Sequence, residues 1–209
     1  MGLFITFEGG EGCGKSTQAK ALRDRLKQQD IPVLLTREPG GTSLGARLRR
    51  VLKTRNNVAL SPRAELLLFA ASRAQLTQEL IRPALEAGTV VVCDRFLHST
   101  LVYQGYGRGL DLATVNEINR VATGGLVPDL TVLIDMPPEQ GLARKRTPRD
   151  RFESEDPAFH DRVRKGYLVT AAADPDRWLV IDGCLAKKTI AGIVWDRVST
   201  QLPKRQHGA

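Results

Sequence analysis

The chain has 209 residues, 42% of them hydrophobic, which is enough to bury a substantial core within the size of one domain. No run approaches the ~20 apolar residues of a membrane span, and no basic segment precedes the first apolar run, so we expect neither a membrane span nor a signal peptide. The three cysteines form no C-x-x-C pair, which is typical of reduced thiols in the cytoplasm. The net charge of +8 fits nucleic acid, an anionic membrane or phosphorylated ligands.

A glycine-rich loop follows the first predicted strand, residues 3–7. Its sequence, GGEGCGKST, fits the pattern G-x-x-x-x-G-K-[ST], and a predicted helix follows it over residues 16–29. Glycines allow successive backbone N–H groups to face one concavity, where they bind phosphate oxygens at the positive end of the helix. In this motif Lys15 reaches the β- and γ-phosphates of a nucleotide, and the Ser16 hydroxyl binds Mg²⁺.

The alternative is a glycine-rich turn that binds nothing. The strand before the loop and the helix after it favour a nucleotide-phosphate site. The residues of this predicted site are Gly9, Gly10, Glu11, Gly12, Cys13, Gly14, Lys15, Ser16 and Thr17. A cysteine thiol at a helix N-terminus can be reactive, so Cys13 is either a reactive thiol or a small side chain that fits the loop.

The rest of the chain alternates between apolar strands and helices. Further strands are predicted at 32–36, 89–93, 130–135 and 178–182. Helices are predicted at 45–53, 61–87 with a break or kink near Pro83, 99–105, 111–123, 138–146, from 156 past 168, and 186–202. Because residues 66–71 are apolar all round, we expect their helix to be buried on more than one face. The pattern indicates an α/β fold, a five-stranded parallel sheet with helices on both faces, in one domain over residues 1–209.

Charged and polar residues follow three of the predicted strands. Ligands in parallel α/β sheets bind beyond the carboxyl ends of the strands. Asp94-Arg95 and residues 36–38 occupy such ends, as does the glycine-rich loop, so we expect all three to meet in one cleft. A structural Asp94–Arg95 pair and a loop salt bridge between Arg37 and Glu38 are the alternatives.

Six motifs occur in order along the chain. They are FEGGEGCGKST at 7–17, TREPGGT at 36–42, Phe69 and Arg73 four residues apart, DRF at 94–96 with Ser99-Thr100, YQG at 103–105 and GRG at 107–109. Together they resemble the bacterial thymidylate kinase family, from the first strand to the closing helix. The resemblance implies the P-loop NTPase fold with a short basic lid at about 144–155. It also implies transfer of the γ-phosphoryl group of ATP to dTMP with Mg²⁺, giving dTDP and ADP for dTTP synthesis by de novo and salvage routes. A homodimer is implied as well. From the cysteines, the lack of a long apolar run and the lack of a nucleic-acid recognition motif, we expect a cytoplasmic protein with neither a membrane nor a nucleic-acid partner.

The resemblance also assigns the residues that bind the nucleoside of dTMP. Phe69 stacks on thymine and Arg73 hydrogen-bonds the base, roles that an apolar ring and a guanidinium on one helical face can fill. Thr100 and Gln104 resemble the readers of the polar edge of thymine, and Tyr103 packs against the sugar and disfavours a 2′-hydroxyl. Without the resemblance, a core aromatic, a surface arginine and ordinary loop packing would explain the same residues.

A second group of residues is assigned to the phosphates and the metal. Arg95 holds the acceptor phosphate bidentately, and Asp94 orients Mg²⁺ through water or orients a phosphate-binding arginine. Arg37 resembles a second phosphate-binding residue. Glu11 resembles the acid that contacts the 3′-hydroxyl of the acceptor.

The basic cluster of residues 144–151 resembles the lid of the family. Many relatives carry an arginine inside the P-loop, but this chain has Gly-Glu-Gly-Cys at 10–13. The cation for the transition state is therefore expected from the lid, with Arg149 and Arg151 as candidates. Thr147-Pro148 replaces a stretch that relatives often make glycine-rich, so the choice between the two arginines stays open, and a solvated basic loop is the alternative.

Three other functions are compatible with parts of the sequence. A P-loop kinase with a different acceptor would share the phosphate loop. A P-loop regulator would bind ATP without acceptor-dependent turnover. A nucleic-acid binder would show a steep salt dependence, but no recognition motif of that kind is visible.

Overall fold

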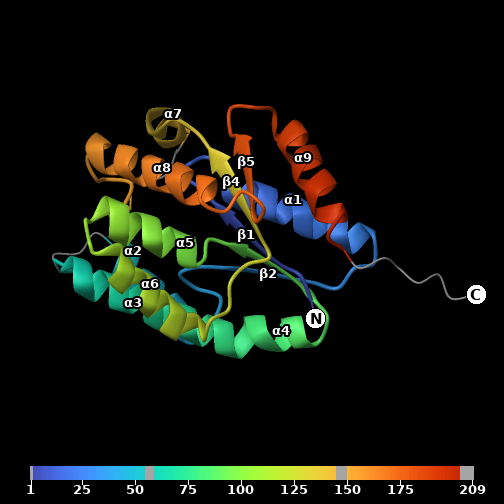
Figure 1. Cartoon of the computed structure of the whole chain (residues 1–209), viewed down its shortest axis with the longest axis horizontal. Coiled ribbons are helices and arrows are strands. Elements are labelled where there is room, and N and C mark those ends of the chain that lie inside the picture. The colour runs from blue at the N-terminus through green and yellow to red at the C-terminus, as the bar shows by residue number, and fades with distance from the viewer. Residues whose placement is uncertain (1, 55–58, 145–149, 203–209) are drawn as a thin grey trace, which may run out of the picture.

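The computed structural model describes residues 2–54, 59–144 and 150–202. Its five strands form one parallel sheet in the order β2-β3-β1-β4-β5 (Figure 1). The strands are β1 (Phe4–Glu8), β2 (Val33–Arg37), β3 (Val90–Asp94), β4 (Leu130–Asp135) and β5 (Trp178–Asp182). The predicted α/β fold with a five-stranded parallel sheet is confirmed. Because β1 lies in the centre of the sheet, the loop that follows it is at the point where the strand order reverses, the usual place for a ligand.

Helices cover both faces of this sheet (Figure 1). One face carries α1 (Lys15–Gln28) and α9 (Lys187–Ser199). The other carries α3 (Pro62–Leu76), α4 (Arg82–Glu86), α5 (Leu97–Thr100) and α8 (Pro157–Ala172). Outside this second layer, α2 (Ser43–Lys53) and α6 (Leu112–Thr123) both pack against α3, and the short α7 (Pro138–Ala143) follows β4.

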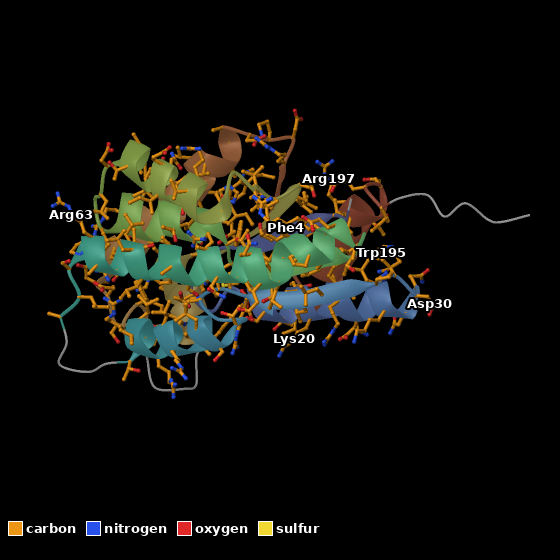
Figure 2. All side chains as sticks on the ribbon, turned by 90° about the horizontal axis from the view of Figure 1, so that it is seen from below. Phe4, Lys20, Asp30, Arg63, Trp195 and Arg197 are labelled. Atoms are coloured by element: carbon orange, nitrogen blue, oxygen red, sulfur yellow. The ribbon has the colours of Figure 1, made fainter. Side chains whose placement is uncertain are left out.

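The central strands are buried on both sides. In β3, Val90 and Val92 pack under α1 and α9, whereas Val91 and Cys93 point to the opposite layer. This double burial explains why β3 is apolar at every position before its last residue. The helices α1 and α9 are also joined at the far end of the molecule from Arg63, where the Arg25 guanidinium of α1 lies 4.3 Å from the centre of the Trp195 ring of α9 (Figure 2).

The long helix predicted at 61–87 contains a π-helical segment. Ser61 caps its start, since its hydroxyl oxygen accepts from the backbone N–H of Ala64 at 3.2 Å. The irregular segment is η1 (Thr77–Ile81), and α4 then carries Pro83. Proline cannot donate a backbone hydrogen bond to the preceding turn, so the regular α pattern gives way just before it. A second π-helical segment, η2 (Leu101–Gly107), continues α5.

The prediction that the apolar stretch of α3 is buried on more than one face is confirmed, except along one exposed side of the helix. Leu66 and Ala70 are buried, but Leu67 is 57% exposed. The helix is packed against α2 and α6 while its outer side faces away from the protein. Its composition is thus more apolar than the burial within one chain requires.

The His98 ring provides a test of how burial affects stability. Its centre lies 4.7 Å from that of Trp178, and Nδ1 is 3.4 Å from Thr131 Oγ1. Burial lowers the pKa of His98 from 6.5 to about 3. The unfolded state therefore binds more protons between these values, and the free energy of unfolding falls as the pH drops, by at most ~1.4 kcal/mol per pH unit. His98→Phe keeps an aromatic ring and removes the titration. Between pH 7 and pH 5 the melting temperature of His98→Phe should fall less than that of the unchanged protein. Equal falls would show that the titration of His98 does not cause the loss of stability.

Candidate active site

The phosphate loop joins β1 to α1 and depends on its glycines. Gly9, Gly12 and Gly14 have φ values of 137°, 71° and 104°, which other residues rarely adopt. A Cβ on Gly12 would lie 1.8 Å from the carbonyl oxygen of Gly141 in α7, so the loop also needs glycine for close packing. The predicted order of strand, loop and helix is present.

The two residues predicted to hold Mg²⁺ lie side by side. The Ser16 hydroxyl, at the start of α1, donates a hydrogen bond to Asp94 Oδ2, at the end of β3, across 78 residues of sequence. Hydroxyl and carboxylate oxygens are the hard ligands that Mg²⁺ prefers, so these residues fit the ion. Among the described residues, no group of three or more His, Cys, Asp or Glu side chains could hold a metal without further ligands.

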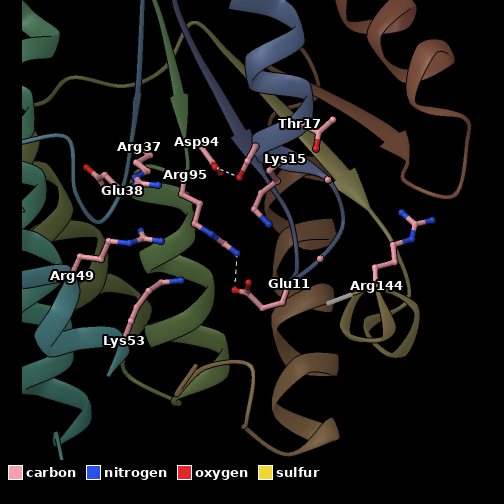
Figure 3. Close-up of a pocket in the computed structure, with 13 residues that line it drawn as sticks. Glu11, Lys15, Thr17, Arg37, Glu38, Arg49, Lys53, Asp94, Arg95 and Arg144 are labelled. Atoms are coloured by element: carbon pink, nitrogen blue, oxygen red, sulfur yellow. Dashed lines mark hydrogen bonds and ion pairs between the residues drawn. The ribbon is translucent and has the colours of Figure 1, made fainter. Parts of the chain in front are cut away.

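Next to the loop is a cleft of about 320 Å³ lined mainly by charged side chains (Figure 3). The Lys15 ammonium at its centre donates to the carbonyl oxygen of Gly10 at 2.5 Å. The other cations lining the cleft are Arg37, Arg49, Lys53, Arg95 and Arg144. They come from the ends of β2 and β3, from α2 and from the residue after α7, and Figure 3 shows Arg144 across the loop from the others. Such a cleft suits a ligand with several phosphates.

Arg49 and Lys53 are members of this group to which the sequence motifs give no role. They lie four residues apart, one helical turn, on the basic helix α2. Lys53 Nζ is 2.7 Å from Asp150 Oδ2. The signal available in the sequence was the basic composition of this helix just after the 36–42 motif.

Arg95 lies between the cleft and a second pocket and contributes to both. Its φ of 73° is in the left-handed region, and its guanidinium donates to Glu11 Oε1 at 2.7 Å and to the Tyr103 hydroxyl at 3.2 Å. Burial alone would raise the pKa of Glu11, but the charges of Arg95, Lys15 and Lys53 hold it well below its usual range. Glu11 is therefore a carboxylate that keeps the Arg95 guanidinium in place.

Glu8 supports this arrangement and was not assigned a role from the sequence. The carboxylate is fully buried and accepts from the Phe96 backbone N–H at 2.8 Å, the Ser99 hydroxyl at 2.6 Å and the Tyr167 hydroxyl at 2.8 Å. Burial raises the pKa of Glu8. These bonds fix the turn after β3 that carries Arg95. An acidic residue at the end of an otherwise apolar strand was the signal in the sequence.

The second pocket contains most of the residues predicted to bind the nucleoside. It is lined by Phe69, Thr100, Tyr103 and Gln104, together with Phe152. The Phe69 and Phe152 rings are 5.7 Å apart, and the Tyr103 hydroxyl donates to Glu11 at 2.9 Å. The pocket thus combines aromatic faces with two polar side chains, directly beside the phosphate cleft.

Arg73 lies beneath this pocket and is 1% exposed. Its guanidinium donates from Nε to Glu38 Oε2 at 2.8 Å, from Nη1 to Asn119 Oδ1 at 2.5 Å and from Nη2 to Thr100 Oγ1 at 2.6 Å. In this structure Arg73 supports a residue of the pocket. Its direct hydrogen bond to the base stays a prediction.

The predicted lid arginines are only partly described. Arg149 lies outside the described residues, and Arg151 is ion-paired with Glu65, with Nη1 2.6 Å from Oε2. Arg151 Nε also donates to the carbonyl oxygen of Leu52 at 3.0 Å, so this side chain belongs to the wall near α2 and α3.

Within the P-loop, the Cys13 thiol is 2% exposed and packs in the core, which favours the interpretation as a small side chain that fits the loop.

Comparison with known proteins identifies the family. The family model described as thymidylate kinase matches residues 7–191. The chain belongs to the thymidylate kinase family. A thymidylate kinase of Dehalococcoides mccartyi is 53% identical over 203 residues, covering 97% of this chain and 98% of that one. The thymidylate kinase of Thermomicrobium roseum is 50% identical over 208 residues and covers 98% of both chains. The crystal structure of thymidylate kinase from Ehrlichia chaffeensis superimposes with a TM-score of 0.78 at 34% identity, over 94% of this chain and 98% of the other. The predicted family is confirmed.

Proposed function

We propose that this thymidylate kinase works by holding ATP and dTMP in its two adjoining pockets. The reaction of the family transfers the γ-phosphoryl group of ATP to dTMP and yields dTDP and ADP, a step in dTTP synthesis. The observation that carries the proposal is the shared boundary of the pockets, where Glu11, Lys53 and Arg95 line both. The P-loop side suits a triphosphate, and the side lined by Phe69 suits a pyrimidine.

The transfer itself requires alignment and neutralisation of charge. A phosphate oxygen of dTMP attacks the γ-phosphorus, and the bond from that phosphorus to the bridging oxygen of ADP breaks. The acceptor phosphate is already largely ionised near pH 7, because the second pKa of a phosphate monoester is about 6, so no general base is needed. Lys15, which lines the cleft, and Arg95, which lines both pockets, carry positive charge to the phosphates. Arg37 serves as a further phosphate-binding residue, and Glu11 contacts the 3′-hydroxyl.

Mg²⁺ would be held by the Ser16 hydroxyl and, through water, by Asp94, which the structure places together. When bound, the ion neutralises charge on the β- and γ-phosphate oxygens. The remaining ligands would come from the phosphates and water.

We place the enzyme in the cytoplasm, where its free cysteines Cys13, Cys93 and Cys184 stay reduced. Separately, no helix in the described part of the chain is long and apolar enough to cross a membrane.

A coupled assay of ADP release tests the acceptor. The acceptors dTMP, dUMP, dCMP, AMP, GMP and thymidine are compared at equal concentration. We expect the highest kcat/KM with dTMP. A preference for another acceptor would identify a different P-loop kinase, and ATP binding without acceptor-dependent turnover would identify a regulator.

The lid arginines are tested by Arg149→Ala and Arg151→Ala, singly and together. An arginine that stabilises the transferred phosphoryl group can contribute about 10³-fold or more in rate. At least one variant should therefore lose most of its kcat while its KM for dTMP changes little. Arg144→Ala is measured alongside these variants for comparison, because Arg144 is a described arginine that lines the same cleft. Near-normal turnover in all of the variants at 149 and 151 would show that the lid assignment is wrong.

We also propose that the chain forms a homodimer through α2, α3 and α6. Exposed apolar side chains gather on these three adjacent helices: Leu44, Val51, Leu67 and Val121. The outer side of α3 would then be buried, as its composition predicts. Sedimentation should give twice the chain mass of 23.0 kDa. Leu67→Arg should shift the protein to monomer, whereas Val180→Arg, at a 49% exposed position on β5, should leave the dimer intact. A monomer before mutation would contradict the proposal.

A further inference from the structure

Two polar side chains of the nucleoside pocket are held from behind by buried charged groups. Gln104 Nε2 donates to Glu65 Oε1 at 2.8 Å, and both residues are 1% exposed. Thr100 Oγ1 accepts from Arg73 Nη2 at 2.6 Å, and these two side chains are also 1% exposed. Because these hydrogen bonds are buried, Gln104 and Thr100 each keep one orientation. A rotated side chain would lose its hydrogen-bond partner where little water can replace it.

The partners determine the hydrogen-bonding direction of each group. A carboxylate only accepts hydrogen bonds, so the amide nitrogen of Gln104 must face Glu65 and the amide oxygen must face away from it. A guanidinium only donates, so the hydroxyl proton of Thr100 must point away from Arg73. Both residues line the pocket. From these two residues the pocket is therefore offered an acceptor, the Gln104 amide oxygen, and a donor, the Thr100 hydroxyl.

Two arginines are ion-paired with Glu65 and hold its carboxylate in place. Arg108 Nε is 3.2 Å from Glu65 Oε1, and Arg151 Nη1 is 2.6 Å from Oε2. Arg108 is itself bound by Glu155, with Nη2 2.6 Å from Oε1. A rotation of the Glu65 carboxylate would break ion pairs with both arginines.

We propose that Glu65 is a positioning residue through which the pocket selects acceptors with a 4-oxo pyrimidine edge over those with a 4-amino edge. Thymine and uracil present an N3–H donor and an O4 acceptor, which match the amide oxygen and the hydroxyl. Cytosine presents the reverse, an N3 acceptor and an N4 amino donor, so acceptor faces acceptor and donor faces donor. Glu65 does not contact the base and acts by orienting Gln104. This inference rests on the proposed function, with dTMP bound in this pocket.

The test compares kcat/KM for dTMP and dCMP in Glu65→Gln and in Glu155→Gln. A glutamine at 65 has both a donor and an acceptor end, so the Gln104 amide can turn over and accommodate cytosine. We expect the dTMP-to-dCMP ratio of kcat/KM to fall by about tenfold or more in Glu65→Gln. Glu155→Gln removes the same charge from Arg108 without touching Gln104 and should keep the ratio within about twofold. The double variant Glu65→Gln/Gln104→Glu restores a fixed acceptor toward the pocket and should recover most of the ratio.

Each result separates the inference from its alternatives. If Glu65 is only structural, Glu65→Gln changes kcat/KM for dTMP, dUMP and dCMP in parallel, and the unchanged ratio overturns the proposal. Should Glu65→Gln fail to fold, Gln104→Met keeps Glu65 and both arginines and should still lower the ratio; an unchanged ratio there overturns it as well. If the unmodified enzyme releases no ADP with dTMP, the proposed function fails instead.

Discussion

Replacing Arg95 with alanine is expected to lower kcat/KM for dTMP by about 10³-fold or more, the range known for arginines that neutralise a transferred phosphoryl group. Arg95 is the guanidinium that lines both pockets, and its contacts with Glu11 and Tyr103 hold it there before any ligand binds. The loss also leaves the partly buried Glu11 carboxylate without its ion-pair partner, and this carboxylate would repel an incoming phosphate. Steady-state kinetics with dTMP and ATP measure the effect.

Two further variants separate charge from geometry. Arg95→Lys keeps a cation but cannot form the paired hydrogen bonds of a guanidinium, so its activity should lie between those of alanine and arginine. Arg177→Ala is the matched control, because Arg177 is 54% exposed and ion-paired with Asp174 in the turn between α8 and β5. It should keep kcat/KM within about twofold. An Arg95→Ala enzyme within tenfold of normal would remove Arg95 from the mechanism.

The order of the strands and helices, and their bounds to within a few residues, were predictable because their signals are local. Apolar runs such as Val90–Cys93, the Ser61-Pro62 start of α3 and the glycine stop after α6 each act over a few residues. The meeting of Ser16 with Asp94 followed from a general rule about strand ends. The π-helical segments had no comparable signal, because they arise where a continuous helix accommodates proline or a bend.

The supporting residues of the site were harder to predict. Glu8 and Glu65 act through buried hydrogen bonds to residues about 40 to 160 positions away in sequence, and no local pattern records such pairs. Arg73 shows the same difficulty. Its spacing from Phe69 suggested a surface of the pocket, whereas tertiary packing buries it below the pocket with Glu38 and Asn119.

Removing the Arg73 guanidinium should therefore affect stability strongly. Arg73→Met is expected to lower the free energy of unfolding by about 3–5 kcal/mol, because the buried carboxylate of Glu38 loses its partner. For a chain of this size the melting temperature should fall by roughly 6–20 °C. Glu38→Gln/Arg73→Met removes the stranded charge as well and should recover part of the loss. Arg177→Met, at an exposed ion pair, should change the melting temperature by less than about 2 °C.

The pH dependence of this loss identifies its cause. Burial raises the pKa of Glu38 to about 7 even beside Arg73, and without the guanidinium it should rise further. A carboxyl group with a raised folded pKa binds more protons in the folded state, so its unfavourable effect is absent below the unfolded pKa and grows as the pH rises through the folded pKa. The stability difference between Arg73→Met and the unchanged protein should accordingly be smaller at pH 5 than at pH 8. A difference that is constant with pH, or a double variant no more stable than the single one, would assign the loss to the bonds with Asn119 and Thr100 instead.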